Sequence, residues 1–155
     1  MSEEKTKKEL YSYQHDAIEK LLKRLHAAPE NHNILYQLPT GGGKTVIFSE
    51  VARRYIDDTK KKVLILTHRI ELCTQTSSML TEFGIFNKII DSSVKELPDQ
   101  NKYQCFVAMV ETLNNRLQEE EFSMDNIGLV IVDEAHYNSF SKLFKYFDKS
   151  IILGV

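Results

Sequence analysis

The chain has 155 residues and a formal net charge of −2, from 20 basic and 22 acidic side chains. Hydrophobic residues make up 42% and charged residues 27%, which is the balance of one globular domain and excludes collagen-like and low-complexity chains. The small net charge excludes a surface that is basic all over, so any nucleic-acid contact must be local.

The first half of the chain alternates helical and extended patterns. Polar residues 1–9 are expected to be disordered, and apolar residues at helical spacing over 18–25 predict a helix. A short strand is expected at 33–37, and a helix begins near Lys44 after a glycine-rich turn. The apolar run within 62–67 predicts a strand that is buried on both faces, as in a parallel sheet.

The second half continues the alternation. In chain order it predicts a helix at 70–83, strands at 88–91 and 105–110, a helix at 113–120, a strand at 127–132, a helical segment at 140–147 and a strand at 151–153. Strands that alternate with helices imply an α/β fold, with a parallel sheet, right-handed crossovers and helices on both faces. Neither a linker nor an internal repeat divides the chain.

The cysteines and the N-terminus bear on the compartment. Cys73 and Cys105 lie far apart without metal-binding spacing, so we expect two buried free thiols. The N-terminus carries no apolar signal segment, and no apolar run reaches the roughly 20 residues of a membrane span. These features predict a cytoplasmic protein with no membrane partner.

The first chemical motif lies between a predicted strand and a predicted helix. It runs Thr40, Gly41, Gly42, Gly43, Lys44, Thr45. Glycines let the backbone wrap around a phosphate, Lys44 would add a positive charge, and the Thr45 hydroxyl would coordinate Mg²⁺. Leu38 stands where the general phosphate-loop pattern has glycine. The alternative interpretation is a flexible loop with an incidental Lys-Thr pair.

The second motif follows the predicted strand 127–132 and reads Asp133, Glu134, Ala135, His136. Asp133 could hold Mg²⁺ opposite Thr45, and Glu134 could orient a water molecule and accept its proton. The alternative is an acidic helix N-terminus. Ligands of open parallel sheets bind beyond the carboxyl ends of the strands, so we expect the two motifs to meet if their strands are neighbours.

The two motifs in this order resemble the first RecA-like domain of superfamily 2 DEAD/DEAH-box helicases. The resemblance covers residues 10–155 and implies a RecA-like P-loop NTPase fold. The segments LTHRIELCTQ and VAMVETLNNRL resemble most the helicase subunits of restriction enzymes. The resemblance to superfamily 2 helicases assigns roles to further residues. Gln14 reads adenine, and His68, Arg69 and Thr112 contact nucleic acid. His136 couples the nucleotide site to the nucleic-acid site.

The resemblance also implies cofactors, partners and an activity. The cofactors are ATP and Mg²⁺, the partner is nucleic acid (DNA rather than RNA), and the activity is that of an ATP-dependent helicase or translocase. In this family a second RecA-like domain follows, so the chain is expected to be C-terminally incomplete, to bind nucleotide weakly and to hydrolyse it little. The alternative is a nucleotide-binding switch or regulatory module that does not unwind.

Overall fold

The structure is a computed structural model that describes residues 12–27, 33–35, 44–67, 69–94, 97, 99–118, 124, 126–132, 141–147 and 149–154. Six parallel strands form one sheet in the order β1-β6-β5-β2-β4-β3. They are β1 (Asn33–Leu35), β2 (Lys62–Thr67), β3 (Asn87–Ile90), β4 (Cys105–Met109), β5 (Ile127–Val132) and β6 (Ile151–Gly154).

Both faces of the sheet are covered, which is why the interior of β2 and the whole of β5 carry no polar side chain. Along β2, Val63 and Ile65 contribute to one hydrophobic core, and Leu64 and Leu66 contribute to the other. Successive side chains of a strand point to opposite faces, so an uninterrupted apolar run requires cover on both sides. The predicted α/β class, with a parallel sheet between helices, is therefore confirmed.

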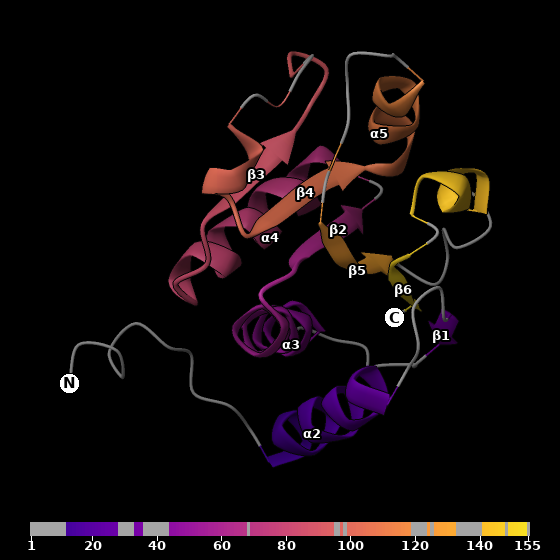
Figure 1. The fold of residues 1–155 in the computed structure, drawn as a ribbon. Helices are drawn as coiled ribbons and strands as arrows, with labels where there is room; N and C mark the ends of the chain where they lie inside the picture. The colour runs from indigo at the N-terminus through magenta and orange to yellow at the C-terminus, as the bar shows by residue number, and fades with distance from the viewer. Residues whose placement is uncertain are drawn as a thin grey trace.

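Helices α2 (Ser12–Ala27), α3 (Lys44–Thr59) and α4 (Ile70–Glu82) pack on one face (Figure 1). The other face is covered by α5 (Val110–Leu117) and by the 3₁₀ helix η3 (Ser141–Tyr146). Cys73 and Cys105 are free and buried, as predicted. Among the described residues, none of the helices is long and apolar enough to cross a membrane.

Two local predictions are corrected, and one short element was not predicted. The segment expected to be helical at 140–147 contains the 3₁₀ helix η3, because residues three apart lie on one face of either kind of helix. The helix expected at 113–120 begins at Val110 instead, since Met109, the extended last residue of β4, is also the N-cap residue of the helix. A short 3₁₀ turn, η1 (Gln100–Lys102), was not predicted.

Candidate functional site

The strand ends that precede the predicted motifs lie in one row. Paired Cα positions run across all six strands at this level, through Leu35, Gly154, Val132, Leu66, Ala108 and Ile90. Since all the strands are parallel, these residues lie at the carboxyl end of the sheet, and the segments that follow them in the chain begin there. Both chemical motifs and both predicted nucleic-acid segments begin within a few residues of this row.

The strands before the two chemical motifs are not direct neighbours. β1 precedes the glycine-rich segment and β5 precedes Asp133, with β6 between them. Two strand spacings amount to roughly 10 Å, a distance that a bound polyphosphate and its metal ion can bridge. β6 contributes Gly154 to the row, a residue with no side chain. The two motifs were expected to meet if their strands were neighbours, and this condition is not met. Both strands nevertheless end at the carboxyl end of the sheet.

The first turn of α3 starts at this end of the sheet and carries Lys44 and Thr45, which are both half-buried. This turn contains no acidic residue that would neutralise the positive end of the helix dipole. At the start of a 16-residue helix, an ammonium group can donate hydrogen bonds to a polyphosphate, and a hydroxyl oxygen can coordinate the Mg²⁺ ion that accompanies it. The described part of the predicted nucleotide site therefore fits the proposed ligand.

Several predicted site residues lie outside the residues whose side chains are described: Gln14, Thr40, Gly41, Gly42, Gly43, His68, Asp133, Glu134 and His136. Within the described ranges, three or more His, Cys, Asp or Glu side chains nowhere gather closely enough to hold a metal ion.

The predicted nucleic-acid residues follow the adjacent strands β2 and β4, whose last residues, Thr67 and Met109, are paired. Arg69 is exposed at the N-terminus of α4 and makes no side-chain hydrogen bond to that helix end. Thr112 is half-buried in the first turn of α5. The segments that carry Arg69 and Thr112 therefore begin at the carboxyl ends of two adjacent strands.

Sequence reasoning placed Thr67 in the same segment as Arg69 but missed its hydrogen bonds. Its hydroxyl donates a hydrogen bond of 3.2 Å to the Arg69 carbonyl and lies 3.0 Å from the Cys73 thiol. Thr67 and Cys73 are both buried, and burial raises the pKa of the Cys73 thiol. The signal in the sequence was a polar residue at the end of an otherwise apolar strand.

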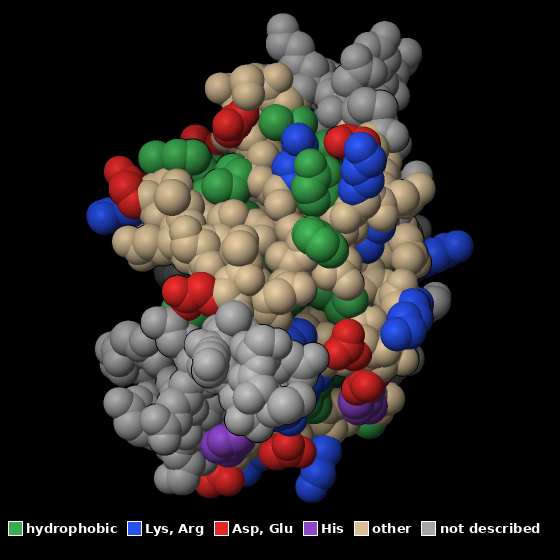
Figure 2. All heavy atoms as spheres, turned by 90° about the vertical axis from the view of Figure 1, so that its left-hand side faces the viewer, with side chains coloured by type: hydrophobic (Ala, Val, Ile, Leu, Met, Phe, Trp, Pro, Cys, Tyr) green, Lys and Arg blue, Asp and Glu red, His purple; other side chains and the backbone are tan. Residues whose placement is uncertain are grey.

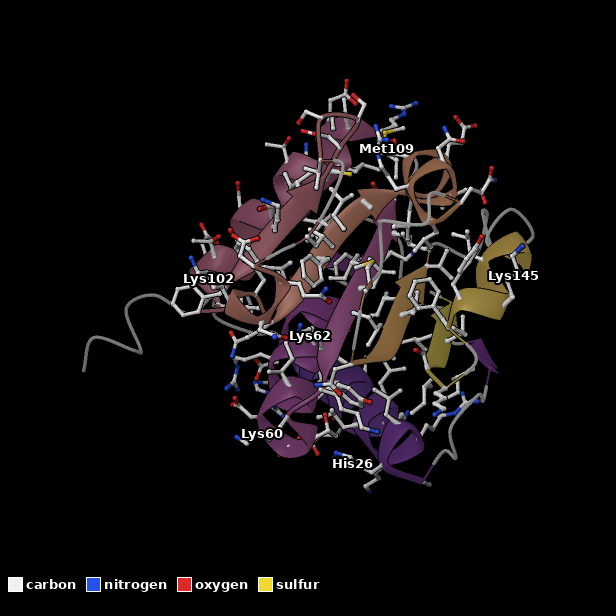
Figure 3. The ribbon with its side chains drawn as sticks, turned by 45° about the horizontal axis from the view of Figure 1, so that its top comes forward. His26, Lys60, Lys62, Lys102, Met109 and Lys145 are labelled. Atoms are coloured by element: carbon white, nitrogen blue, oxygen red, sulfur yellow. The ribbon has the colours of Figure 1, made fainter. Side chains whose placement is uncertain are left out.

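The amino-terminal ends of the strands, at the opposite end of the sheet, carry lysines and a groove. A groove of about 310 Å³ there is lined by Lys60, Lys61 and Lys62 and by the side chains of Asn101 and Asn126. Figure 3 shows Lys60 and His26 at the end of the molecule away from Met109. The lysine run therefore lies far from the strand ends that carry the candidate site.

Charged side chains of both signs lie on the face of the molecule that Figure 2 shows. Figure 2 shows acidic and basic side chains interspersed among the described residues of this face, without one large basic area. The small net charge agrees with this pattern. Binding of a nucleic acid would therefore depend on local contacts such as Arg69 rather than on a long-range field.

Comparisons with known proteins agree with this fold. The family model described as "Type III restriction enzyme, res subunit" matches residues 7–155. The Saccharomyces cerevisiae protein named "Putative ATP-dependent helicase IRC3" is 32% identical over 91% of this chain and 21% of its own length. The human "Helicase POLQ-like" is 30% identical over 82% of this chain and 12% of its own. Our chain thus spans about a fifth or less of these relatives.

Solved structures show the same architecture. The UvsW helicase of bacteriophage T4 superposes with a TM-score of 0.67 at 22% identity, over 95% of this chain and 52% of that one. The helicase domain of Pyrococcus furiosus Hef gives 0.66 at 20% identity, over 92% and 31%. The chain therefore shares the fold of these two helicase structures. The chain belongs to the family of type III restriction enzyme res subunits, which confirms the predicted resemblance.

Proposed function

We propose that this chain is the ATP-binding part of a motor that hydrolyses ATP when it is bound to nucleic acid. Residues 10–155 would form part of the first RecA-like domain of a longer helicase or translocase. The observation that supports the proposal is the single row of strand ends that precede, in the chain, both chemical motifs and both nucleic-acid segments. ATP and nucleic acid would then both bind at the carboxyl end of the sheet.

Each residue of the nucleotide site has a proposed task. Lys44 and the backbone of Thr40, Gly41, Gly42 and Gly43 bind the phosphates, and Gln14 recognises adenine. Thr45 and Asp133 hold Mg²⁺, which when bound neutralises charge on the phosphate oxygens. Glu134 orients the attacking water and accepts its proton.

The nucleic-acid residues have a separate task. Arg69 and His68 contact phosphates, which positions a strand without reading its sequence. Thr112 contacts the same strand from α5, and His136 couples it to the nucleotide site. We favour DNA over RNA as the partner because the family match is to subunits of restriction enzymes. The proposed compartment is the cytoplasm.

Two variants test the nucleotide site. Lys44→Ala is expected to abolish binding of a fluorescent ATP analogue, because no other described side chain in the first turn of α3 is cationic. Glu134→Gln is expected to leave binding intact and to lower the turnover of the full-length protein roughly 10²- to 10⁴-fold. A fully active Glu134→Gln protein would refute the role of Glu134 as base.

A second comparison separates the motor from a regulatory module. The ATPase rate of the full-length protein is measured with and without DNA or RNA, and the 155-residue chain is measured alongside. We expect nucleic acid to stimulate the full-length protein. The isolated chain should be slow, because arginine fingers from a second domain contribute roughly 10³- to 10⁵-fold in rate. No stimulation by either nucleic acid would favour a nucleotide-binding switch.

A further inference from the structure

The turn between β2 and α4 is held from inside the protein by a chain of hydrogen bonds. The Arg69 carbonyl accepts one bond from the Thr67 hydroxyl and one from the Cys73 backbone N–H, each 3.2 Å long. Thr67 ends β2, and Cys73 lies in the first turn of α4. We propose that Thr67, supported by Cys73, is a positioning residue that fixes Arg69 for contact with a nucleic-acid phosphate; this rests on the function proposed above.

The direction of the bonds follows from the number of hydrogens. A threonine hydroxyl has one hydrogen, and Thr67 uses it for the Arg69 carbonyl. The contact of 3.0 Å between the Thr67 oxygen and the Cys73 sulfur must therefore be donated by the thiol. Burial raises the pKa of Cys73, which keeps this thiol protonated at neutral pH. The bonds thus run in one direction, from thiol to hydroxyl to carbonyl.

The chain of bonds holds the backbone of Arg69 while its side chain stays available. Arg69 is exposed and forms no ion pair or side-chain hydrogen bond with any described residue. Thr67 is β-branched, so few rotamers are open to it and its hydroxyl direction is well defined. A fixed backbone with an unoccupied guanidinium reduces the ordering cost when a phosphate binds.

Thr67→Val removes the hydroxyl but keeps the shape of the side chain. We expect affinity for a fluorescein-labelled oligo(dT) probe, measured by anisotropy, to fall roughly three- to tenfold, the equivalent of one lost hydrogen bond. The slope of log affinity against log salt should become shallower by about 0.7, the value for one phosphate contact on a single strand. Binding of the fluorescent ATP analogue should not change.

The control is Thr74→Val in the same turn of α4. The Thr74 hydroxyl donates to the Ile70 carbonyl at 3.3 Å, so this variant makes the same chemical change one carbonyl away from Arg69. It should bind oligo(dT) like the wild type, and Thr67→Ser, which keeps the hydroxyl but not the β-branch, should bind more tightly than Thr67→Val. If Thr67→Val fails to fold, Cys73→Ala gives the second test, with a smaller loss in the same direction.

Arg69→Ala separates failure of this inference from failure of the proposed function. If Thr67 acts through Arg69, adding Thr67→Val to Arg69→Ala causes no further loss of affinity. A further loss in that background would overturn the inference, as would wild-type affinity and salt slope in Thr67→Val when Arg69→Ala binds weakly. If Arg69→Ala itself binds oligo(dT) normally, the proposed nucleic-acid role of Arg69 is wrong, and the inference falls with it.

Discussion

At the scale of single residues, Gly128 shows how tightly α3 lies against the sheet. A Cβ atom at Gly128 would lie 2.4 Å from the Tyr55 hydroxyl oxygen and 2.7 Å from Cδ of Lys61. Glycine is depleted in strands unless another part of the chain approaches closely, and here Tyr55 of α3 does so. Gly128 is therefore needed for the contact between α3 and β5, the elements that carry Lys44 and precede Asp133.

Gly128→Ala is expected to destabilise the protein by about 1–3 kcal/mol, the usual cost of overpacking, measured by urea unfolding. Adding Tyr55→Phe should recover only part of the loss, because it removes the nearest atom but leaves Lys61 Cβ at 2.9 Å. Tyr55→Phe alone serves as the control. Equal stability of Gly128→Ala and the wild type would show that β5 moves away from α3 at no cost.

At the scale of elements, a charged network on α3 joins that helix to α2. The buried carboxylate of Glu50 accepts hydrogen bonds from Arg53 at 2.7 and 2.8 Å and from Arg54 at 2.8 Å. Arg54 also donates to Glu19 of α2 at 2.8 Å. The network therefore holds together the helix that begins at Lys44 and the helix that contains Gln14.

The network makes stability depend on pH. Burial alone would raise the pKa of Glu50, but its hydrogen bonds and ion pairs with Arg53 and Arg54 outweigh burial, and the pKa lies below its ordinary value of 4.5. A lowered pKa in the folded state stabilises the protein above the unfolded pKa. This contribution is lost as the pH falls from about 4.5 through the folded value.

Glu50→Gln is expected to lower the free energy of unfolding by about 2 kcal/mol at pH 7, because it leaves two arginines without their buried partner. The difference from the wild type should shrink as urea unfolding is repeated at pH values below 4.5. Asp57→Asn is the control, since Asp57 is exposed where it pairs with Arg53 and should contribute under 1 kcal/mol. A difference that stays constant with pH would contradict the assignment.

At the scale of the whole molecule, the sheet order places the glycine-rich segment after an edge strand and the acidic motif after a central strand. β2 and β5 lie inside the sheet, whereas the three-residue strand β1 lies at one edge and β3 at the other. Central strands with paired neighbours on both sides open last, and short edge strands open most easily. The glycine-rich segment is thus attached to one of the least protected strands.

Amide hydrogen exchange tests this arrangement. We expect the slowest exchange in β2 and β5 and faster exchange in β1. Addition of a Mg²⁺–ATP analogue should slow exchange in β1 and in the first turn of α3, since ligand binding stabilises the segments that it orders. The β3 edge serves as the internal control and should not respond. Protection at β3 or at the lysine-lined groove, without a change in β1, would place the nucleotide elsewhere.

Local patterns predicted much of this architecture. The apolar runs at 62–67 and 127–132 became strands with those bounds, and the helix after the glycine-rich turn begins at Lys44. Gly84 ends α4 with a φ of +78°, a conformation that glycine adopts readily. These features depend on the periodicity of apolar residues or on the conformational preference of one residue. Both can be recognised in a short segment of the sequence.

Other features depend on partners distant in the chain. No local pattern reveals that β6 separates β1 from β5, that Tyr55 presses on Gly128, or that Arg54 of α3 pairs with Glu19 of α2. The hydrogen bonds that join Thr67, Arg69 and Cys73 form within the turn between β2 and α4, so only the three-dimensional structure shows them.

The order of residues along the chain was thus enough for the α/β class, for the two chemical motifs and for the family. Folding in three dimensions decided which strands lie side by side and which buried groups hold Arg69 in place. The physical reason is that a strand or helix pattern depends on neighbours a few residues away, whereas strand pairing and buried hydrogen bonds depend on which surfaces pack together once the chain has collapsed.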